Sequence, residues 1–402
     1  QPNNQNATND KKRKRKEVFK FVSPGRIEIV GNHTDHNHGK VLVAAIELAL
    51  TADAQKTDDN VITLNSKGFP PVRVDLSDTA KIPAETGSPQ GLTRGVADGF
   101  LKRGLKTGGF RAEAVSTIPV GAGVSSSAAF ELLAAQILNE FYNGGAADRV
   151  TLAKIGQYAE NVYMDKPSGL LDQMGIALGG ATYIDFKDAE KPRIESVTPA
   201  LDGYKIVIVN TGGDHSDMTA HYAAIKSEMQ AVARFFKRDY LADVPPREFY
   251  GSIPALCGRN AVGECNAVGG RNAVGGRAVL RAAHFFDENA RVEKAFKALR
   301  DNKPPAFFAA VAASGQSSYK LLQNCYAPGD AEQRIPLALY MAGRVLKKGA
   351  YRVHGGGFAG TVLAFVHESE FDAFTETFAP VFGRENLIVT TVRPQGAGPV
   401  GK

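Results

Sequence analysis

The sequence has few cysteines and no long apolar run. Its three cysteines show no Cys-x-x-Cys spacing, and an odd number cannot all pair, which argues against a disulfide framework and suits a reducing compartment. Apolar stretches such as residues 41–50 are too short to span a bilayer. Residues 1–10 are polar, unlike a signal peptide. We therefore expect a cytoplasmic protein that has no membrane partner.

Excess positive charge is also missing from most of the chain. The formal net charge of +6 equals the contribution of one run, residues 11–16, and the other 42 basic residues balance the 42 acidic ones. The hypothesis of a nucleic-acid-binding protein would rest on this run alone, and the run lacks interleaved aromatic residues. We expect residues 1–16 to be a disordered basic tail, and we expect no nucleic-acid partner. The balanced remainder suits an enzyme that attracts an anion with a local site.

The 402 residues exceed the size at which single cores stop growing, about 250–300 residues, so two domains are expected. Period-2 strand patterns and helical patterns intermingle up to residue 186, and a stretch rich in proline and acidic residues, 188–199, follows. Helical patterns then dominate before strands return at residues 351–353, 361–366 and 387–392. We predict an α+β (mixed α/β) enzyme with domains at 17–198 and 199–402 and a cleft between them.

An Asn-Ala-Val-Gly unit repeats with a six-residue period within residues 260–275. A hexapeptide β-helix is one interpretation, but three imperfect copies cannot bury a core by themselves. The repeat is more typical of an expanded surface loop.

A glycine- and serine-rich segment, residues 119–129, follows a predicted strand and opens a predicted helix. Glycines let successive backbone N–H groups turn toward one anion, and the helix N-terminus reinforces that field. No Gly-Lys-[Ser/Thr] follows, so this is not a Walker A loop. The placement favours phosphate binding over an ordinary helix cap.

Three other segments carry polar groups in places that suggest chemistry. Residues 25–39 place His33, Asp35, His36 and His38 directly after a strand. This segment could be a structural turn, a site that recognises the hydroxyl groups of a small molecule, or a zinc site. Zinc is the least favoured, because no fourth ligand is assigned. Asp172 stands among apolar neighbours, and the residues alone do not separate a helix cap from a functional carboxylate. Residues 355–360 form a second glycine loop, which by itself is a weak signal.

Together and in this order, these segments resemble the galactokinase branch of the GHMP small-molecule kinases. Residues 25–35 match the sugar signature, 121–129 the nucleotide signature, 167–173 the segment of the catalytic aspartate and 355–360 the third motif. Residues 211–222 and 281–291 also resemble family segments. The similarity covers residues 21–392, and several ordered motifs are more specific than one.

The resemblance implies a two-domain fold with the active site in the cleft. It also implies transfer of the γ-phosphoryl group of ATP, with Mg²⁺, to the anomeric hydroxyl of a hexose, giving galactose 1-phosphate and ADP from galactose. Asp172 matches the catalytic base, and Arg26 lies beside it, where a cation keeps the carboxylate ionised and stabilises the transferring group. We expect a monomer whose partners are a sugar and ATP-Mg.

The resemblance also assigns the other site positions. The residues that match the phosphate loop are Gly121, Ala122, Gly123, Val124, Ser125, Ser126, Ser127 and Ala128. Those that match the metal-handling positions are Ser127 and Glu160, and those that match sugar contacts are His33, Asp35, Gly169 and Tyr222.

Two positions depart from the family pattern. Galactokinases usually carry Glu where this chain has Asn32, and Asn where it has Glu28. Strand alternation puts Glu28 on the same face as Arg26. We therefore count Asn32 and Glu28 among the sugar-binding candidates and infer that Glu28 partly replaces the missing carboxylate or that the substrate is not galactose. His36, at a position that is usually Tyr, raises the same question.

Two alternatives to a galactokinase remain. One is a kinase for a related sugar, such as an N-acetylhexosamine or a uronic acid. The other is a non-catalytic sugar sensor, which resembles these kinases but has a damaged serine loop. Residues 125–129 and Asp172 are intact here, which favours catalysis.

Overall fold

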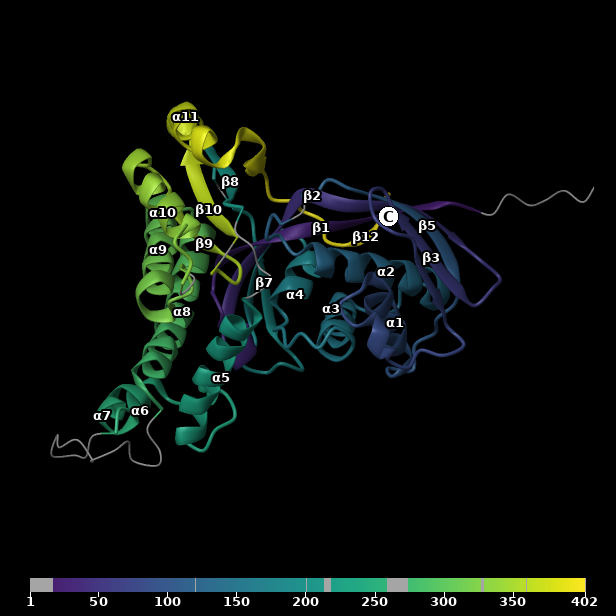
Figure 1. Cartoon of the computed structure of the whole chain (residues 1–402), viewed down its shortest axis with the longest axis horizontal. Helices are drawn as coiled ribbons and strands as arrows, with labels where there is room; N and C mark the ends of the chain where they lie inside the picture. The colour runs from purple at the N-terminus through teal and green to yellow at the C-terminus, as the bar shows by residue number, and fades with distance from the viewer. Residues whose placement is uncertain are drawn as a thin grey trace, which may run out of the picture.

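A computed structural model gives the fold and describes residues 17–119, 121–199, 201–212, 218–258, 274–326, 329–358 and 360–401. The predicted tail 1–16 and most of the repeat 260–275 lie outside the described residues. Within the described residues, strands form two sheets, and helices pack on both of them (Figure 1).

The first sheet has the strand order β12-β1-β2-β5-β3-β4, with β6 on β2 and β7 on β6. All pairs are antiparallel except β3 with β5. Its strands are β1 (Phe19–Val30), β2 (Lys40–Lys56), β3 (Val61–Ser66), β4 (Val72–Asp75), β5 (Phe110–Ser116), β6 (Ala181–Asp185), β7 (Arg193–Val197) and β12 (Gly398–Pro399). The alternation of buried and exposed residues in β5 shows that one face of this sheet is buried and the other is exposed to solvent.

Four helices cover that buried face: α1 (Pro89–Leu101), α2 (Ser126–Asn143), α3 (Arg149–Tyr158) and α4 (Leu171–Leu178). Helices α2 and α4 pack directly on β1 and β2. A π-helical turn, Ala159–Tyr163, extends α3 and widens the helix where Glu160 points inward. These helices therefore deliver residues 126–128, 160 and 172 to the end of β1 that carries Arg26.

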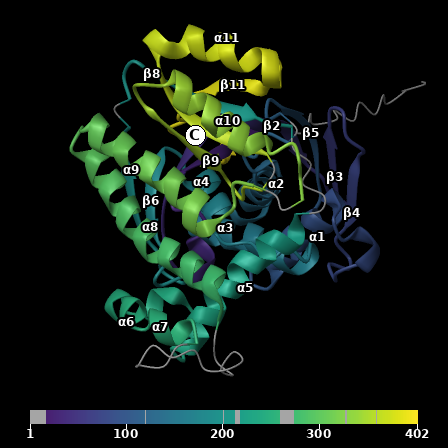
Figure 2. The same ribbon diagram turned by 60° about the vertical axis from the view of Figure 1, so that its left-hand side comes forward.

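The second sheet has the order β11-β8-β10-β9 and is antiparallel throughout, with strands β8 (Tyr204–Asn210), β9 (Ala350–His354), β10 (Thr361–His367) and β11 (Leu387–Thr390). Helices α10 (Arg334–Val345) and α11 (Phe371–Phe382) enclose one apolar core with it, and α9 (Pro304–Ser317) packs on β9. The longest helix, α8 (Gly276–Arg300), pairs with α9 and with α5 (Thr219–Phe235) (Figure 2). Two short helices, α6 (Pro246–Gly251) and α7 (Ile253–Leu256), lie at one end of α8.

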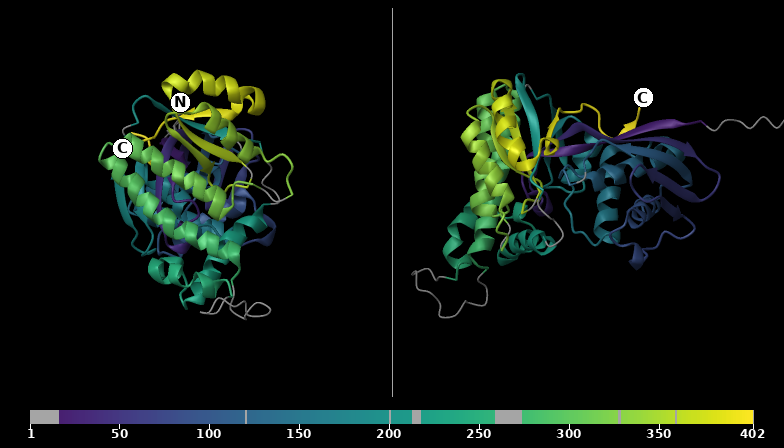
Figure 3. Two further views of the ribbon diagram at one scale, coloured as in Figure 1. Left: turned by 90° about the vertical axis from the view of Figure 1, so that its left-hand side faces the viewer. Right: turned by 45° about the horizontal axis from the view of Figure 1, so that its top comes forward.

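The two halves share a continuous core. Helix α8 packs against β1 and β2, and α9 packs against β1. Apolar residues of β10 belong to the same cluster as those of the first sheet. The chain beyond β11 returns to the first sheet, where Val392 bridges Ile46 and β12 pairs with β1 (Figure 3). Residues from both halves can therefore meet around the end of β1.

The sequence patterns predict most of these elements, and the α+β class is confirmed. Residues 18–22 and 26–30 each show the alternation of a separate short strand, which predicts two strands. They form one strand, β1, because a local irregularity at Pro24–Arg26 keeps the chain paired with β2. Six of the described strands and α-helices were not expected: β7, within the stretch taken for a domain junction, β12, α4, α6, α7 and α11. Helix α4 has only eight residues, and α11 contains Pro380, so neither gives a strong periodic signal.

Candidate active site

Asp172 is held by one residue from the sugar-signature segment and one from the serine loop. Arg26 Nε donates a hydrogen bond to Asp172 Oδ1 at 2.8 Å, and the Ser125 hydroxyl donates to Asp172 Oδ2. Burial alone would raise the pKa of Asp172, but the charge of Arg26 and the hydrogen bonds from Arg26 and Ser125 outweigh burial and lower it. Asp172 is therefore an ionised carboxylate at neutral pH, with both oxygens oriented.

The serine loop presents backbone N–H groups at the start of α2. Gly121 and Gly123 adopt positive φ angles of 73° and 67°, as a tight turn requires. Ser125, the N-cap, has φ 62° and makes no side-chain cap, because its hydroxyl is directed to Asp172. The first backbone bond into the helix is Ala129 N–H to Ser125 O, so the N–H groups of residues 126–128 have no intrahelical acceptor. Such a terminus suits an anion.

Arg26 also fixes this loop from the strand side. Its Nη1 donates to the carbonyl of Gly123 at 2.8 Å, and its backbone N–H donates to the carbonyl of Val124 at 3.1 Å. A Cβ at position 123 would lie 2.5 Å from Thr361 Oγ1, so the second half of the chain meets the loop there. One arginine thus joins the carboxylate and the phosphate loop.

Ser127 and Glu160 lie together, in the first turn of α2 and in the π-helical turn. Ser127 Oγ donates to Glu160 Oε1 at 3.0 Å, and Lys166 Nζ pairs with the same oxygen at 2.7 Å. Gln173 Nε2 donates to Glu160 Oε2 and to Glu131 Oε2, both at 3.1 Å. Burial, reinforced by the charge of Glu160, raises the pKa of Glu131 well above its usual value.

This cluster fits a hard divalent cation. Hydroxyl, carboxylate and amide oxygens are the donors that Mg²⁺ accepts. Two buried oxygens, Glu131 Oε1 and Gln173 Oε1, have no hydrogen-bond partner among the described residues. The donor set and its two unpaired oxygens are compatible with a bound Mg²⁺.

Asp35 and Gly169 meet at the start of α4, one turn from Asp172. Asp35 Oδ2 accepts a hydrogen bond from the N–H of Leu171 at 3.1 Å, and Oδ1 accepts from the N–H of His36 at 2.9 Å. Burial raises the pKa of Asp35, and the negative charge of Asp172 adds to that rise. A Cβ at position 169 would lie 1.8 Å from Asp35 Oδ2, so only glycine allows this approach.

His33 and Tyr222 bind the glycine loop 355–358 from two sides. His33 Nε2–H donates to the carbonyl of Gly356 at 3.0 Å, and the Tyr222 hydroxyl donates to the carbonyl of Gly357 at 3.0 Å. A Cβ on Gly356 would lie 2.4 Å from the Tyr222 ring. Burial lowers the pKa of His33 to about 4, so the ring is neutral at physiological pH.

Glu28 and Asn32 contact each other. Asn32 Nδ2 donates to Glu28 Oε1 at 2.9 Å, and Arg352, from β9, forms an ion pair with the same oxygen at 2.9 Å. Burial raises the pKa of Glu28, and the charges of Arg352 and Arg26 oppose the rise. The N–H of Glu28 donates to His354 Nε2 at 3.0 Å, which ties β1 to the strand that precedes the glycine loop.

Helix α8 clamps the turn that carries Asn32 and His33. Glu288 Oε1 accepts from the N–H of Gly31 at 3.0 Å, and His284 Nε2–H donates to the carbonyl of Asn32 at 2.9 Å. Positive neighbours, His284 and Arg352 foremost, outweigh burial and lower the pKa of Glu288 to about 2. The helix that resembles a family segment thus positions the sugar-signature loop.

The structure therefore brings the predicted residues into one region, and it adds others that the sequence patterns did not single out. These are Glu131, Lys166, Gln173, Ser318, Asn324, Arg352 and His354. A signal exists for Arg352, a charge inside an apolar strand, and for Glu131, a charge inside an apolar helix. Neither signal identifies the residue with which the buried charge interacts.

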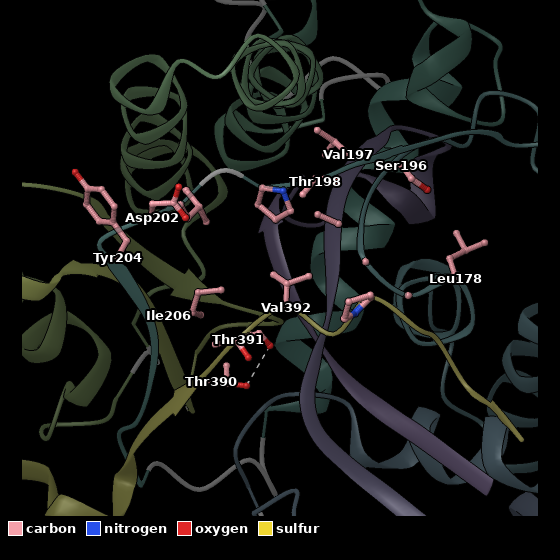
Figure 4. A pocket seen from close by; sticks show the side chains of 16 residues that line it. Leu178, Ser196, Val197, Thr198, Asp202, Tyr204, Ile206, Thr390, Thr391 and Val392 are labelled. Atoms are coloured by element: carbon pink, nitrogen blue, oxygen red, sulfur yellow. Dashed lines mark hydrogen bonds between the residues drawn. The ribbon is translucent and has the colours of Figure 1, made fainter. Parts of the chain in front are cut away.

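Two cavities lie near these elements. The larger, of about 540 Å³, lies between the two sheets beside residues 196–206 and 390–394 (Figure 4), and no predicted site residue lines it. The smaller, of about 460 Å³, is lined by Asp35, Gly169 and His36 together with Lys226 and Tyr240. The buried ring nitrogen Nε2 of His36 has no hydrogen-bond partner among the described residues.

The part of the chain that the structure describes contains no group of three or more His, Cys, Asp or Glu side chains arranged to hold a metal ion, so the histidines of residues 33–38 do not form one. Among the same residues, no helix combines the length and apolar character needed to cross a membrane.

Known proteins resemble the chain along most of its length. Residues 92–180 match the model of the GHMP kinases N terminal domain, and residues 10–56 match the galactokinase galactose-binding signature. A galactokinase of Clostridium tetani is 29% identical over 359 residues, which are 88% of this chain and 85% of that protein.

Solved structures show the same relationship. The structure of Lactococcus lactis galactokinase complexed with galactose superimposes with a TM-score of 0.78 and 25% identity, and the match covers 95% of each chain. Mevalonate kinase of Methanococcus jannaschii, with a TM-score of 0.63, 15% identity and coverage of 96% of this chain and 100% of that one, shares the fold. The expected GHMP-kinase-like fold is confirmed.

Proposed function

The chain belongs to the galactokinase family of GHMP kinases, and from this premise we propose that it phosphorylates the anomeric hydroxyl of galactose with the γ-phosphoryl group of ATP. The products are galactose 1-phosphate and ADP. One observation carries the proposal. Arg26 contacts both the carboxylate of Asp172 and the carbonyl of Gly123, so the sugar-signature segment, the phosphate loop and the acidic residue form one unit.

Asp172 is proposed as the base. During transfer, a bond forms between the anomeric oxygen and the γ-phosphorus, the bond from that phosphorus to the leaving oxygen of ADP breaks, and the hydroxyl proton passes to an Asp172 oxygen. Because its pKa is lowered, Asp172 is a weak base that accepts the proton late, after the hydroxyl has become acidic. Most of the rate enhancement then comes from positioning and charge stabilisation, in which Arg26 takes part.

The phosphates are proposed to bind the loop formed by residues 121–128. The N–H groups of residues 126–128, at the start of α2, are available as donors. Arg26 donates two bonds to carbonyls of this loop, which keeps the loop against β1 without an ATP phosphate to order it. A preformed cradle of this kind costs little ordering entropy when the nucleotide binds.

Mg²⁺ is proposed to bind at Ser127 and Glu160. When bound, it would neutralise charge on the phosphates. Ser127 and Glu160 hold their oxygens 3.0 Å apart, and Gln173 fixes the second oxygen of Glu160. The sugar is proposed to contact His33, Asp35, Gly169 and Tyr222, which surround the start of α4 and the loop 355–358.

An ADP-release assay over a panel of monosaccharides, with wild type and Asp172→Asn, tests this function. We expect turnover with galactose, phosphate on the anomeric carbon, and a loss of kcat by about 10²–10⁴ in the variant, the range for removal of a general base. A wild type that binds galactose and ATP but releases no ADP would be a sensor. Turnover with an N-acetylhexosamine or a uronic acid but not with galactose would assign the related-sugar alternative.

We also propose that the enzyme is a cytoplasmic monomer with no nucleic-acid partner. The balanced charge of residues 17–402 supports the last point, since the whole excess lies in residues 11–16. Light scattering of the full chain in the presence and absence of galactose and ATP tests the oligomeric state.

A further inference from the structure

Position 28 carries a carboxylate and position 32 an amide, the reverse of the order usual in galactokinases. The structure shows that these two side chains touch, with Asn32 Nδ2 donating to Glu28 Oε1 at 2.9 Å. Two groups in direct contact can exchange places and leave the local charge unchanged. The question is which of them then faces the sugar.

Asn32 has no group left for a ligand. An amide side chain donates two hydrogen bonds and accepts two. Nδ2 donates to Glu28 Oε1 and, at 2.7 Å, to the carbonyl of Gly355. Oδ1 accepts from Ser318 Oγ at 3.2 Å and from Asn324 Nδ2 at 2.8 Å. The residue is 0% exposed, so its whole capacity is used by the protein.

Glu28 has the opposite property. Its Oε1 accepts a hydrogen bond from Asn32 and forms an ion pair with the guanidinium of Arg352, which is itself 0% exposed. Its Oε2 forms no hydrogen bond or ion pair within the described residues, and 6% of the side chain is exposed. Glu28 follows Arg26 by two residues in β1, and Asn32, which it contacts, directly precedes His33, so the carboxyl lies within the sugar-signature segment.

We propose that Glu28 is the residue that accepts a hydrogen bond from a galactose hydroxyl, through Oε2, and that Asn32 is a positioning residue. Asn32 fixes the Glu28 carboxylate and ties it to the glycine loop at Gly355, while Arg352 neutralises its charge. An acceptor without a protein partner is available to a hydroxyl, and a hydrogen bond to a charged group is stronger than one between neutral groups. This inference rests on the proposed sugar-kinase function and assigns a substrate contact to it.

The test compares galactose with the series of monodeoxygalactoses, using KM and calorimetric Kd for wild type and Glu28→Gln. With wild type, one deoxy sugar should lose about 10- to 100-fold in affinity, as expected for a hydrogen bond to a charged group. With Glu28→Gln, galactose should weaken by a similar factor and that deoxy sugar should show little further loss. An unchanged deoxy penalty in the variant would overturn the inference.

Glu28→Gln leaves Arg352 buried without a counter-ion, so it can fail to fold. Glu28→Asp keeps the charge and shortens the side chain, and it should also reduce the penalty for the same deoxy sugar. A penalty that persists in Glu28→Asp counts against the inference. If wild type phosphorylates no sugar, the proposed function fails. If wild type phosphorylates galactose but the Glu28 variants show the same deoxy-sugar penalty as wild type, this inference alone fails.

The exchange itself tests the role of Asn32. Asn32→Glu alone puts two carboxylates beside one arginine, and Glu28→Asn alone leaves none, whereas the double variant restores one of each. The double variant should regain at least about tenfold in galactose kcat/KM over the worse single variant, because contacting residues couple. The KM for ATP should stay unchanged in all three. Losses that simply add would show that the two residues do not act as a pair.

Discussion

Gly169 lies so close to Asp35 that a Cβ on it would be 1.8 Å from Asp35 Oδ2. Asp35 Oδ2 also accepts the N–H of Leu171, so this carboxylate cannot move aside without losing a bond at the start of α4. The position therefore controls both Asp35 and the helix turn that carries Asp172. Position 169 needs glycine because of this approach, not because of its φ angle.

Replacing Gly169 by alanine should weaken galactose binding. We expect a rise in Kd of about tenfold or more, since the displaced Asp35 loses hydrogen bonds to the backbone that are worth about 1 kcal/mol each. The KM for ATP should change much less, because the phosphate loop lies on α2. Gly251→Ala is a matched control, since a Cβ there meets nothing within 4 Å. Equal galactose affinity for wild type and Gly169→Ala, by calorimetry, would contradict this role.

Removing the Ser125 hydroxyl should lower kcat. Ser125 donates to Asp172 Oδ2 and its hydrogen bond helps to lower the pKa of that carboxyl. Ser125→Ala and Ser125→Gly both remove the bond, and glycine also suits the left-handed φ of 62°. We expect about a tenfold loss of kcat in both variants, for a hydrogen bond to a charged group. Steady-state kinetics decides, with Ser66→Ala at the end of β3 as the control. Full activity of Ser125→Gly would show that the hydroxyl has no role.

The sequence predicts the local parts of this site because each is a short segment. The sugar-signature residues, the serine loop and Asp172 all lie within runs of fewer than a dozen residues, and the structure brings them together as expected. The contact between Ser125 and Asp172 was not predicted. It depends on the left-handed turn at Ser125, which the residue type disfavours.

The buried ionic partners could not be predicted at all. Arg352 interrupts an apolar strand, which marks it as unusual, but its partner Glu28 lies at the other end of the chain. A buried charge is tolerated only when the fold supplies a counter-ion, and strand alternation does not identify which residue that is. The same holds for Glu131 in α2, whose charged neighbour Glu160 lies in the π-helical turn that follows α3.

Stability should fall as the pH drops below the normal histidine range. The pKa of His33 in the folded protein is about 4, lower than the 6.5 of an exposed histidine, so the unfolded state binds more protons between these values. The stability that neutral His33 supports is complete above pH 6.5 and decreases by up to about 1.4 kcal/mol per pH unit as the pH falls toward 4. Burial lowers the pKa of His36, His284 and His354 as well, which adds to the same slope.

The raised pKa values of Glu28, Asp35 and Glu131 act in the opposite direction, so a difference measurement isolates His33. Urea unfolding of wild type and His33→Asn at a series of pH values gives the free energy of unfolding of each. The slope of the variant should be smaller by about one proton between pH 4.5 and 6. Parallel slopes would mean that His33 titrates alike in both states, in conflict with its burial against Gly356.

Glu160→Gln should weaken the binding of Mg²⁺. Glu160 is 2% exposed, and its Oε1 contacts both Ser127 and Lys166. Glu160 and Ser127 form the proposed cation site, and Glu160 supplies its negative charge. An amide keeps the shape but loses the charge that a hard cation favours. We expect the Mg²⁺ concentration for half-maximal activity to rise about tenfold or more, and calorimetric binding of Mg-ADP to weaken alongside it. The galactose KM should hold steady, because the side chains that contact Glu160, namely Ser127, Lys166 and Gln173, are not proposed sugar contacts. Glu190→Gln, an exposed carboxylate paired with Lys154, serves as the control and should behave as wild type. If Glu160→Gln binds Mg-ADP as wild type does, the cation is held elsewhere, and the unpaired oxygens of Glu131 and Gln173 become the next positions to vary.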